Sequence, residues 1–207
     1  MIVAPSAVGK STLMNQVAEL DSDFTRIGGF TSRPQRANDE PGLYEYIPHT
    51  DEGIRSILAQ KEAGQLVQYV IHPTTGFIYG SRLHNYPGTY NMKDTLSNVV
   101  ASLSKLPFHN SHVVGLVTDP QIWHEWFLKR NQHTGDNYQK RVTEAITSLE
   151  WLSSQPEASI SWVYNHPDDI ATDSKELVAL IKGEKKSDPL LRDYAVKMLS
   201  LANQMKE

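Results

Sequence analysis

The 207-residue chain contains no cysteine, which excludes disulfide bonds and thiolate metal sites. It has no apolar run near the roughly 20 residues that a membrane-spanning helix needs. Basic character is also missing: the formal net charge is -4, whereas proteins that bind nucleic acids usually present a basic surface. These absences predict a cytoplasmic protein that binds neither membranes nor nucleic acids. The sequence does not predict an oligomeric state.

Hydrophobic residues make up 39% of the chain and charged residues 21%, which is enough apolar material for one folded domain. Segments with β-strand character alternate with segments whose apolar residues recur at helical spacing. This alternation predicts an α/β fold with a mostly parallel sheet flanked by helices. The expected strands are 2–4, 24–32 with a break at Gly28-Gly29, two within 65–80, 112–118 and 159–164. The expected helices are 10–20, 51–63, 96–106, 120–130, 138–152 and 174–182, with polar loops at 33–42 and 131–137.

Residues 4–12 read Ala-Pro-Ser-Ala-Val-Gly-Lys-Ser-Thr and match the Walker A pattern, with Ala4 in place of its first glycine. A strand before the motif and a helix after it form the context in which backbone N–H groups turn inward onto phosphates. A chance Gly-Lys-Ser in a turn would lack this context. Gly9 allows close approach, Lys10 neutralises phosphate charge, and Ser11 can bind Mg²⁺. The motif predicts a nucleoside triphosphate bound by Ser6, Ala7, Val8, Gly9, Lys10, Ser11 and Thr12.

A second motif, Thr31-Ser32-Arg33-Pro34-Gln35-Arg36, places two arginines three residues apart in a loop. Two guanidinium groups on one loop can hold a phosphate bidentately. The alternative is that both are ordinary solvated loop arginines. Two hydroxyl-bearing segments follow, Gly42-Leu43-Tyr44-Glu45-Tyr46 and Ile78-Tyr79-Gly80-Ser81.

The segments APSAVGKST, TSRPQR, GLYEY and IYGS resemble four motifs of the guanylate kinase family. They occur in the same order as in that family and at similar spacing, and the resemblance covers roughly residues 1–182. The resemblance extends to the segment Asn165-His166-Pro167-Asp168. It implies a P-loop fold for residues 1–183, with an acceptor-binding insert at about 31–86 and a helical lid at about 129–141. Residues 184–207 are then a C-terminal helical extension. The implied reaction is phosphoryl transfer from ATP, with Mg²⁺, to a nucleoside monophosphate.

The same resemblance implies roles for individual residues. Arg33 and Arg36 hold the acceptor phosphate, and two tyrosine hydroxyls donate to it. Tyr46 is an alternative to Tyr44 because the segment is one residue shorter than the family pattern. The implied catalytic residues are Lys10, Arg33, Arg130 and Arg141, the last two from the lid; their alternative is to be exposed helix charges. The implied acceptor-binding residues are Arg33, Arg36, Tyr44, Gln68, Tyr79 and Ser81, and the metal-supporting residues are Ser11 and Asp94.

Two positions of the expected base-binding pocket depart from the family pattern. Gln68 stands where the family has a glutamate that accepts hydrogen bonds from guanine, and Gly29 stands where it has a serine. Glutamine offers donors where a carboxylate has an acceptor. The leading interpretation is a guanylate kinase acting on GMP or dGMP. The alternatives are a kinase of another acceptor, such as a different nucleotide or a ribose phosphate, and a non-catalytic binding module. Lys10, Ser11 and Thr12 disfavour the last because such modules typically lose the lysine.

Overall fold

The computed structural model describes residues 1–37, 39–72, 75–131 and 136–206. Its strands are β1 (Ile2–Val3), β2 (Phe24–Arg26), β3 (Gly29–Thr31), β4 (Tyr44–Tyr46), β5 (Gln68–Ile71), β6 (Ile78–Ser81), β7 (Tyr90–Met92), β8 (Val114–Val117) and β9 (Ser161–Tyr164). Its helices are α1 (Lys10–Leu20), α2 (Asp51–Glu62), α3 (Val100–Leu103), α4 (Pro120–Asn131), α5 (Asp136–Ser154), α6 (Ile170–Lys182) and α7 (Arg192–Gln204). Within the part of the chain that the structure describes, no helix is both long and apolar enough to cross a membrane.

Five parallel strands form the central layer. β1, β8 and β9 pair in parallel, and so do β2 and β7. Two hydrogen bonds join these groups: the Ile2 N–H donates to the Lys93 carbonyl at 2.8 Å, and the Thr95 N–H donates to the Ile2 carbonyl at 3.2 Å. The resulting order is β2-β7-β1-β8-β9. Every residue of β8 is buried, as its near-continuous apolar sequence predicts for a strand covered on both faces.

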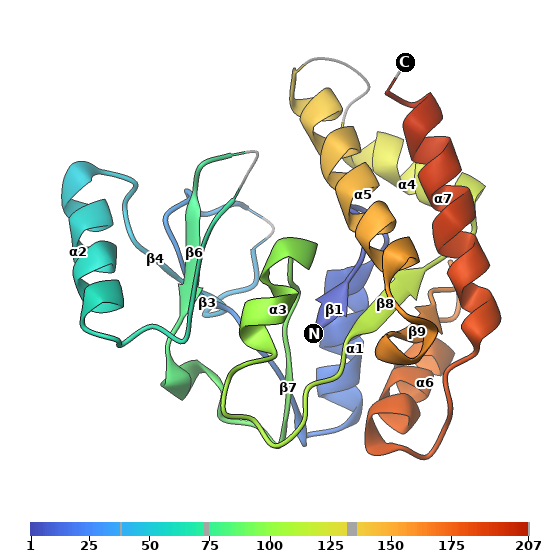
Figure 1. The fold of residues 1–207 in the computed structure, drawn as a ribbon, viewed down its shortest axis with the longest axis horizontal. Coiled ribbons are helices and arrows are strands. Elements are labelled where there is room, and N and C mark those ends of the chain that lie inside the picture. Colours follow the sequence, from blue (N-terminus) through green and yellow to red (C-terminus); the bar gives the residue numbers. More distant parts are fainter. Residues whose placement is uncertain (38, 73–74, 132–135, 207) are drawn as a thin grey trace.

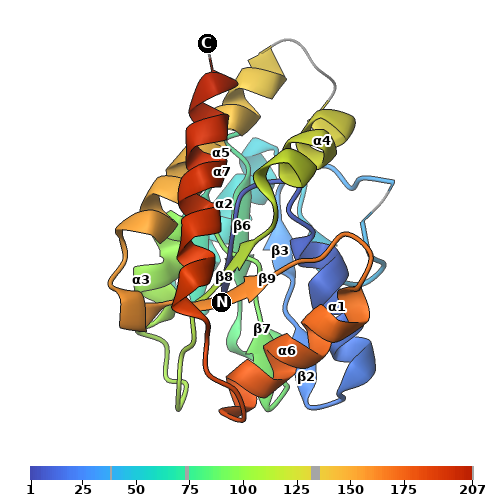
Figure 2. The same ribbon diagram turned by 90° about the vertical axis from the view of Figure 1, so that its right-hand side faces the viewer.

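Helices cover both faces of this layer. Figure 2 shows α1 and α6 on one side of the strands and α5 and α7 on the other. The main hydrophobic core lies between these layers, with Trp123, Phe127, Leu149, Trp162 and Met198 among its fully or almost fully buried side chains. The predicted α/β architecture, a parallel sheet flanked by helices, is confirmed.

A smaller sheet stands beside the central layer, with α2 on its outer side (Figure 1). Its order is β4-β3-β6-β5, with β3 parallel to β4 and antiparallel to β6. It has a core of its own around Phe30, Ile57 and Ile78. The Thr50 hydroxyl starts α2 by accepting from the Gly53 N–H. This lobe overlaps the segment expected to form the acceptor-binding insert.

Several elements differ from the sequence prediction, including two strands that it missed, β4 and β7. The helix expected at 96–106 is only a 3-10 turn (Ser97–Val99) followed by the single turn of α3; Pro107 disfavours helical geometry at the residue before it. α6 begins at Ile170 rather than 174, because the Asp169 carboxylate caps it by accepting from the Thr172 N–H. Both ends of the loop expected at 131–137 are helical, since α4 includes Asn131 and α5 begins at Asp136; residues 132–135 lie outside the described residues.

Candidate functional site

A sharp turn joins β1 to α1 within residues 4–12, the candidate phosphate loop. Two of its residues have left-handed backbone geometry, Ala7 with φ 68° and Gly9 with φ 90°. A Cβ atom added at Gly9 would lie 2.3 Å from the Asn165 Nδ2. Gly9 is therefore required both by its backbone conformation and by this close approach.

Side chains from distant parts of the chain hold the candidate phosphate loop. The Asn165 Nδ2, directly after β9, donates to the Val8 carbonyl at 2.8 Å. The Trp123 Nε1, on α4, donates to the Ser6 carbonyl at 2.9 Å. Trp123 was not predicted from sequence, and Asn165 was noted only through the family resemblance. Both side chains donate to backbone carbonyl groups, and contacts of this kind leave no recognisable sequence motif.

A cavity of about 780 Å³ lies between the candidate phosphate loop, the smaller sheet and the ends of α4 and α5. It opens at the carboxyl ends of the central strands, where α/β folds usually bind ligands. All but one of the predicted site residues line it: Ser6, Ala7, Val8, Gly9, Lys10, Ser11, Thr12, Arg33, Arg36, Tyr44, Gln68, Tyr79, Asp94, Arg130 and Arg141. The exception is Ser81, which lies behind Gln68 and donates its hydroxyl hydrogen to the Gln68 Oε1 at 3.3 Å.

The cavity concentrates positive charge in a chain whose net charge is -4. Seven of its lining side chains are cationic and four are carboxylates. The cations are Lys10, Arg26, Arg33, Arg36, Lys93, Arg130 and Arg141, and the carboxylates are Asp39, Glu40, Asp94 and Glu144. Clefts lined by one sign of charge raise the local concentration of oppositely charged ligands. Such an arrangement can hold polyphosphate and phosphate groups together.

Arg33 makes a two-pronged ion pair with Asp39, a residue that the sequence analysis missed. Its Nη1 and Nη2 donate to the two carboxylate oxygens at 2.6 and 2.7 Å. The Arg36 backbone N–H and the Tyr46 hydroxyl each donate to the Asp39 Oδ2 at 2.7 Å. These donors, with Arg33 foremost, hold the pKa of Asp39 well below its usual range.

The two candidate tyrosines of β4 differ in their surroundings. The Tyr46 hydroxyl is bound to Asp39, whereas Tyr44 lines the cavity. Burial, with a contribution from Asp94, raises the pKa of Tyr44 to about 12. Tyr44 is therefore a neutral hydroxyl donor at pH 7, as its predicted role requires.

The two arginines expected in the lid lie on opposite sides of residues 132–135, which are outside the described residues. Arg130 is near the end of α4, and Arg141 is on α5. Arg141 pairs with Glu144 at 2.8 Å, and Glu144 is 3.6 Å from the His72 Nε2 on the smaller lobe. The pKa of Arg130 is lowered, mainly by desolvation and further by the positive charges of Arg141 and Arg36. The guanidinium groups thus face one shared region of positive charge.

The proposed Mg²⁺ donors are oxygen atoms at the edge of the cavity. The Ser11 hydroxyl is on the first turn of α1, and Asp94 is exposed, 3.8 Å from the Lys10 Nζ. The described residues contain no cluster of three or more metal-binding side chains. Mg²⁺ binds through one or two protein oxygens while keeping waters and phosphate ligands. One hydroxyl and one carboxylate beside this cationic cavity fit that chemistry.

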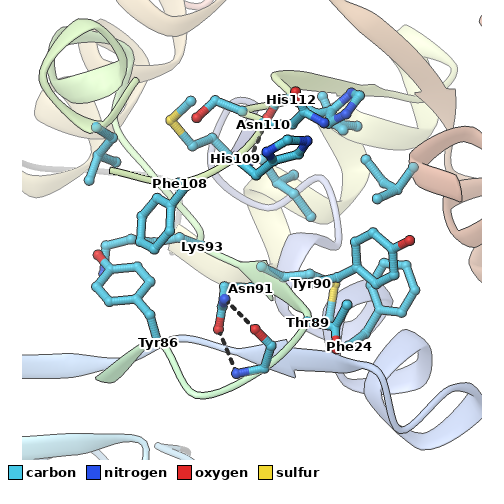
Figure 3. Close-up of a pocket in the computed structure, with 18 of the residues that line it drawn as sticks. Phe24, Tyr86, Thr89, Tyr90, Asn91, Lys93, Phe108, His109, Asn110 and His112 are labelled. Carbon is cyan, nitrogen blue, oxygen red and sulfur yellow. Dashed lines mark hydrogen bonds between the residues drawn. The ribbon is translucent and has the colours of Figure 1, made fainter. Parts of the chain in front are cut away.

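A second cavity, of about 630 Å³, lies at the amino ends of the central strands. Its walls include two aromatic pairs, Phe24 with Tyr90 and Tyr86 with Phe108, which Figure 3 shows on opposite sides of the space. Of the described residues that line it, none is acidic and none belongs to the predicted site. Lys93 lines both cavities. The cationic cavity is therefore the candidate active site.

No protein-family model matches the sequence, and no curated protein matches it. Among solved structures, the crystal structure of guanylate kinase from Anaplasma phagocytophilum matches with a TM-score of 0.58 and 13% sequence identity. The match covers 91% of this chain and 87% of that chain. At this identity the likeness shows the fold alone: the chain has a mixed α/β fold similar to that of a guanylate kinase.

Proposed function

We propose that this protein is an ATP-dependent kinase that phosphorylates a nucleoside monophosphate, with GMP or dGMP as the leading acceptor. One observation carries the proposal: a Walker A segment and two further arginine-bearing elements line the same cationic cavity. The tight turn at Gly9 and the start of α1 provide the backbone geometry that binds phosphates at helix N-termini. The similarity in fold is consistent with this proposal.

The proposed mechanism relies on positioning and charge. The candidate phosphate loop and Lys10 bind the β- and γ-phosphates of ATP. Ser11 and Asp94 would hold Mg²⁺, which would supply further positive charge against these phosphates. Arg33 and Arg36 hold the acceptor phosphate, with Tyr44 and Tyr79 as hydroxyl donors. Arg130 and Arg141 stabilise the negative charge on the phosphoryl group in the transition state of its transfer. Closure of the cavity excludes water and so limits hydrolysis of ATP.

A different acceptor is the second candidate, and the geometry at Gly29 favours it. Gly29 has φ 117°, and a Cβ atom there would lie 2.2 Å from the Gly80 carbonyl oxygen. The serine of the guanylate kinase pattern therefore does not fit this backbone without a shift. Gln68 is buried and its Oε1 accepts from Ser81, which turns amide donors toward the cavity. These features suit an acceptor that presents hydrogen-bond acceptors at this point.

An ADP-release assay across GMP, dGMP, AMP, CMP, UMP and ribose 5-phosphate tests the proposal. We expect ADP release that depends on both Mg²⁺ and one class of acceptor. Activity with another acceptor, together with no activity on GMP or dGMP, would select the second candidate. Absence of transfer to every acceptor would refute the kinase function and leave a non-catalytic binding module.

A further inference from the structure

The guanidinium of Arg33 already uses three of its five N–H donors in this structure. The residue is only 6% exposed. Its Nη1 donates to both Asp39 and the Pro34 carbonyl, and its Nη2 donates to Asp39. The rings of Tyr44 and Tyr46 lie 5.5 and 5.7 Å from its Cζ. An acceptor phosphate therefore cannot bind the Nη1–Nη2 edge of Arg33 bidentately while the Asp39 carboxylate occupies it.

The surroundings of the Asp39 carboxylate resemble those of a bound phosphate. It accepts two hydrogen bonds from one guanidinium, one from the Arg36 backbone N–H and one from the Tyr46 hydroxyl. A fork of guanidinium donors, an inward backbone N–H and a hydroxyl are groups that proteins use to bind phosphate oxygens. The structure thus contains a complete anion site, and a side chain of the same loop fills it.

Arg36 differs from Arg33 in this respect. Its residue is exposed and lines the cavity. Among the described residues, its guanidinium has no hydrogen-bond or ion-pair partner, and only its backbone contacts Asp39. Arg36 can therefore contact an incoming phosphate first, while Arg33 becomes available only after Asp39 moves.

We propose that Asp39 holds the place of the acceptor phosphate on Arg33, and that the acceptor displaces this carboxylate when it binds. This inference rests on the proposed function, because it takes the Arg33 and Arg36 loop as the acceptor site. Asp39 then sets the affinity for the acceptor. If both anions stayed, two like charges would share one guanidinium, which is strongly unfavourable. Asp39 itself is not part of either hydrophobic core cluster, and neither are the described residues from 34 to 43, so a shift of its carboxylate disrupts no core packing.

The test compares Asp39→Asn with a matched control, Glu40→Gln. Both variants remove one negative charge from the same loop and the same cavity, but Glu40 pairs with Arg26 at 2.6 Å and not with Arg33. Dissociation constants for inorganic phosphate and the acceptor panel are measured by calorimetry without ATP. We expect Asp39→Asn to bind the acceptor about tenfold more tightly than Glu40→Gln, because only Asp39→Asn removes the competing carboxylate.

If Asp39→Asn binds the acceptor no more tightly than Glu40→Gln does, the inference is overturned. Asp39 would then either support the position of Arg33 or have no effect on acceptor binding. Absence of binding by the unmutated protein and both variants would overturn the proposed function as well, so the two failures are distinguishable.

A crystal structure of the unmutated protein with its acceptor does not depend on any variant folding. We expect Arg33 on the phosphate and the Asp39 carboxylate beyond hydrogen-bond distance; a retained Arg33–Asp39 pair beside bound phosphate would refute the exchange.

Discussion

Gly9 carries two separate constraints, and a substitution can measure each. Gly9→Ala forces an alanine into φ 90° and places its Cβ 2.3 Å from the Asn165 amide. The strain alone costs about 1 kcal/mol or more. Gly64, with φ 68° and nothing within 4 Å of an added Cβ, shares only the strain. In urea unfolding, Gly9→Ala should lower stability by about 1–3 kcal/mol more than Gly64→Ala, the excess being the clash. Equal losses would mean that the contact with Asn165 is not tight.

Lys10 is the residue on which the proposed chemistry most depends. Its Nζ now donates to the Ala4 and Pro5 carbonyls at 2.8 and 3.1 Å, which holds the amine at the cavity. Lys10→Ala should reduce phosphoryl transfer by at least about a hundredfold, because a preorganised charge is lost from the transition state. The thermal midpoint should change little. Lys175→Ala, at an exposed position on α6, is the control; retained turnover in Lys10→Ala would contradict the role.

At the scale of elements, α7 is an integral part of the main core. It packs against α5 and α4 and buries Ala195, Met198 and Ala202. Met198 is fully buried, so Met198→Ala should destabilise the protein by about 2–5 kcal/mol. Val196, 49% exposed on the same helix, should tolerate alanine within about 0.5 kcal/mol. Chemical denaturation checks both, and similar small effects would show that α7 does not stabilise the fold.

Element prediction from sequence succeeded where the signal is local. The helix ends expected at 63 and 182 lie within one residue of the ends of α2 and α6, and Gly183, with φ 77°, follows α6. The helix expected at 96–106 was wrong in extent because apolar spacing does not distinguish a helix from a buried turn and loop. Leu103 is buried and Leu106 is half-buried, and both line the second cavity without a helix to carry both.

At the scale of the whole molecule, most of the predicted site residues belong to a recognisable motif, and the missed ones act through tertiary contacts. Arg33 and Arg36 stand in one recognisable loop, and the cavity brings them near Lys10. Asp39 is close in sequence but has no motif of its own. Trp123 supports the candidate phosphate loop from 117 residues away, which no local pattern reveals. The assembly of charges around one cavity therefore needed the structure.

Lys93 links the central layer to the smaller lobe and couples the fold to pH. Its Nζ donates to the Gly28 carbonyl at 2.9 Å from a buried position between the two cavities. Burial lowers its pKa from the ordinary 10.5 to about 8, although Asp94 opposes the shift. Between these two values the unfolded chain binds a proton that the folded protein does not bind. Stability from this group therefore rises as pH increases from about 8 toward 10.5.

Replacing Lys93 with methionine removes the titrating amine at similar length. The free energy of unfolding of the unmutated protein, minus that of Lys93→Met, should increase with pH across this window by at most about 3 kcal/mol. Urea unfolding of both proteins from pH 7 to pH 10 measures the difference. Taking the difference cancels the opposite effect of Tyr44, whose raised pKa disfavours folding at higher pH. Parallel pH profiles for the two proteins would show that Lys93 keeps an ordinary pKa, and that the junction between the lobes is hydrated rather than closed.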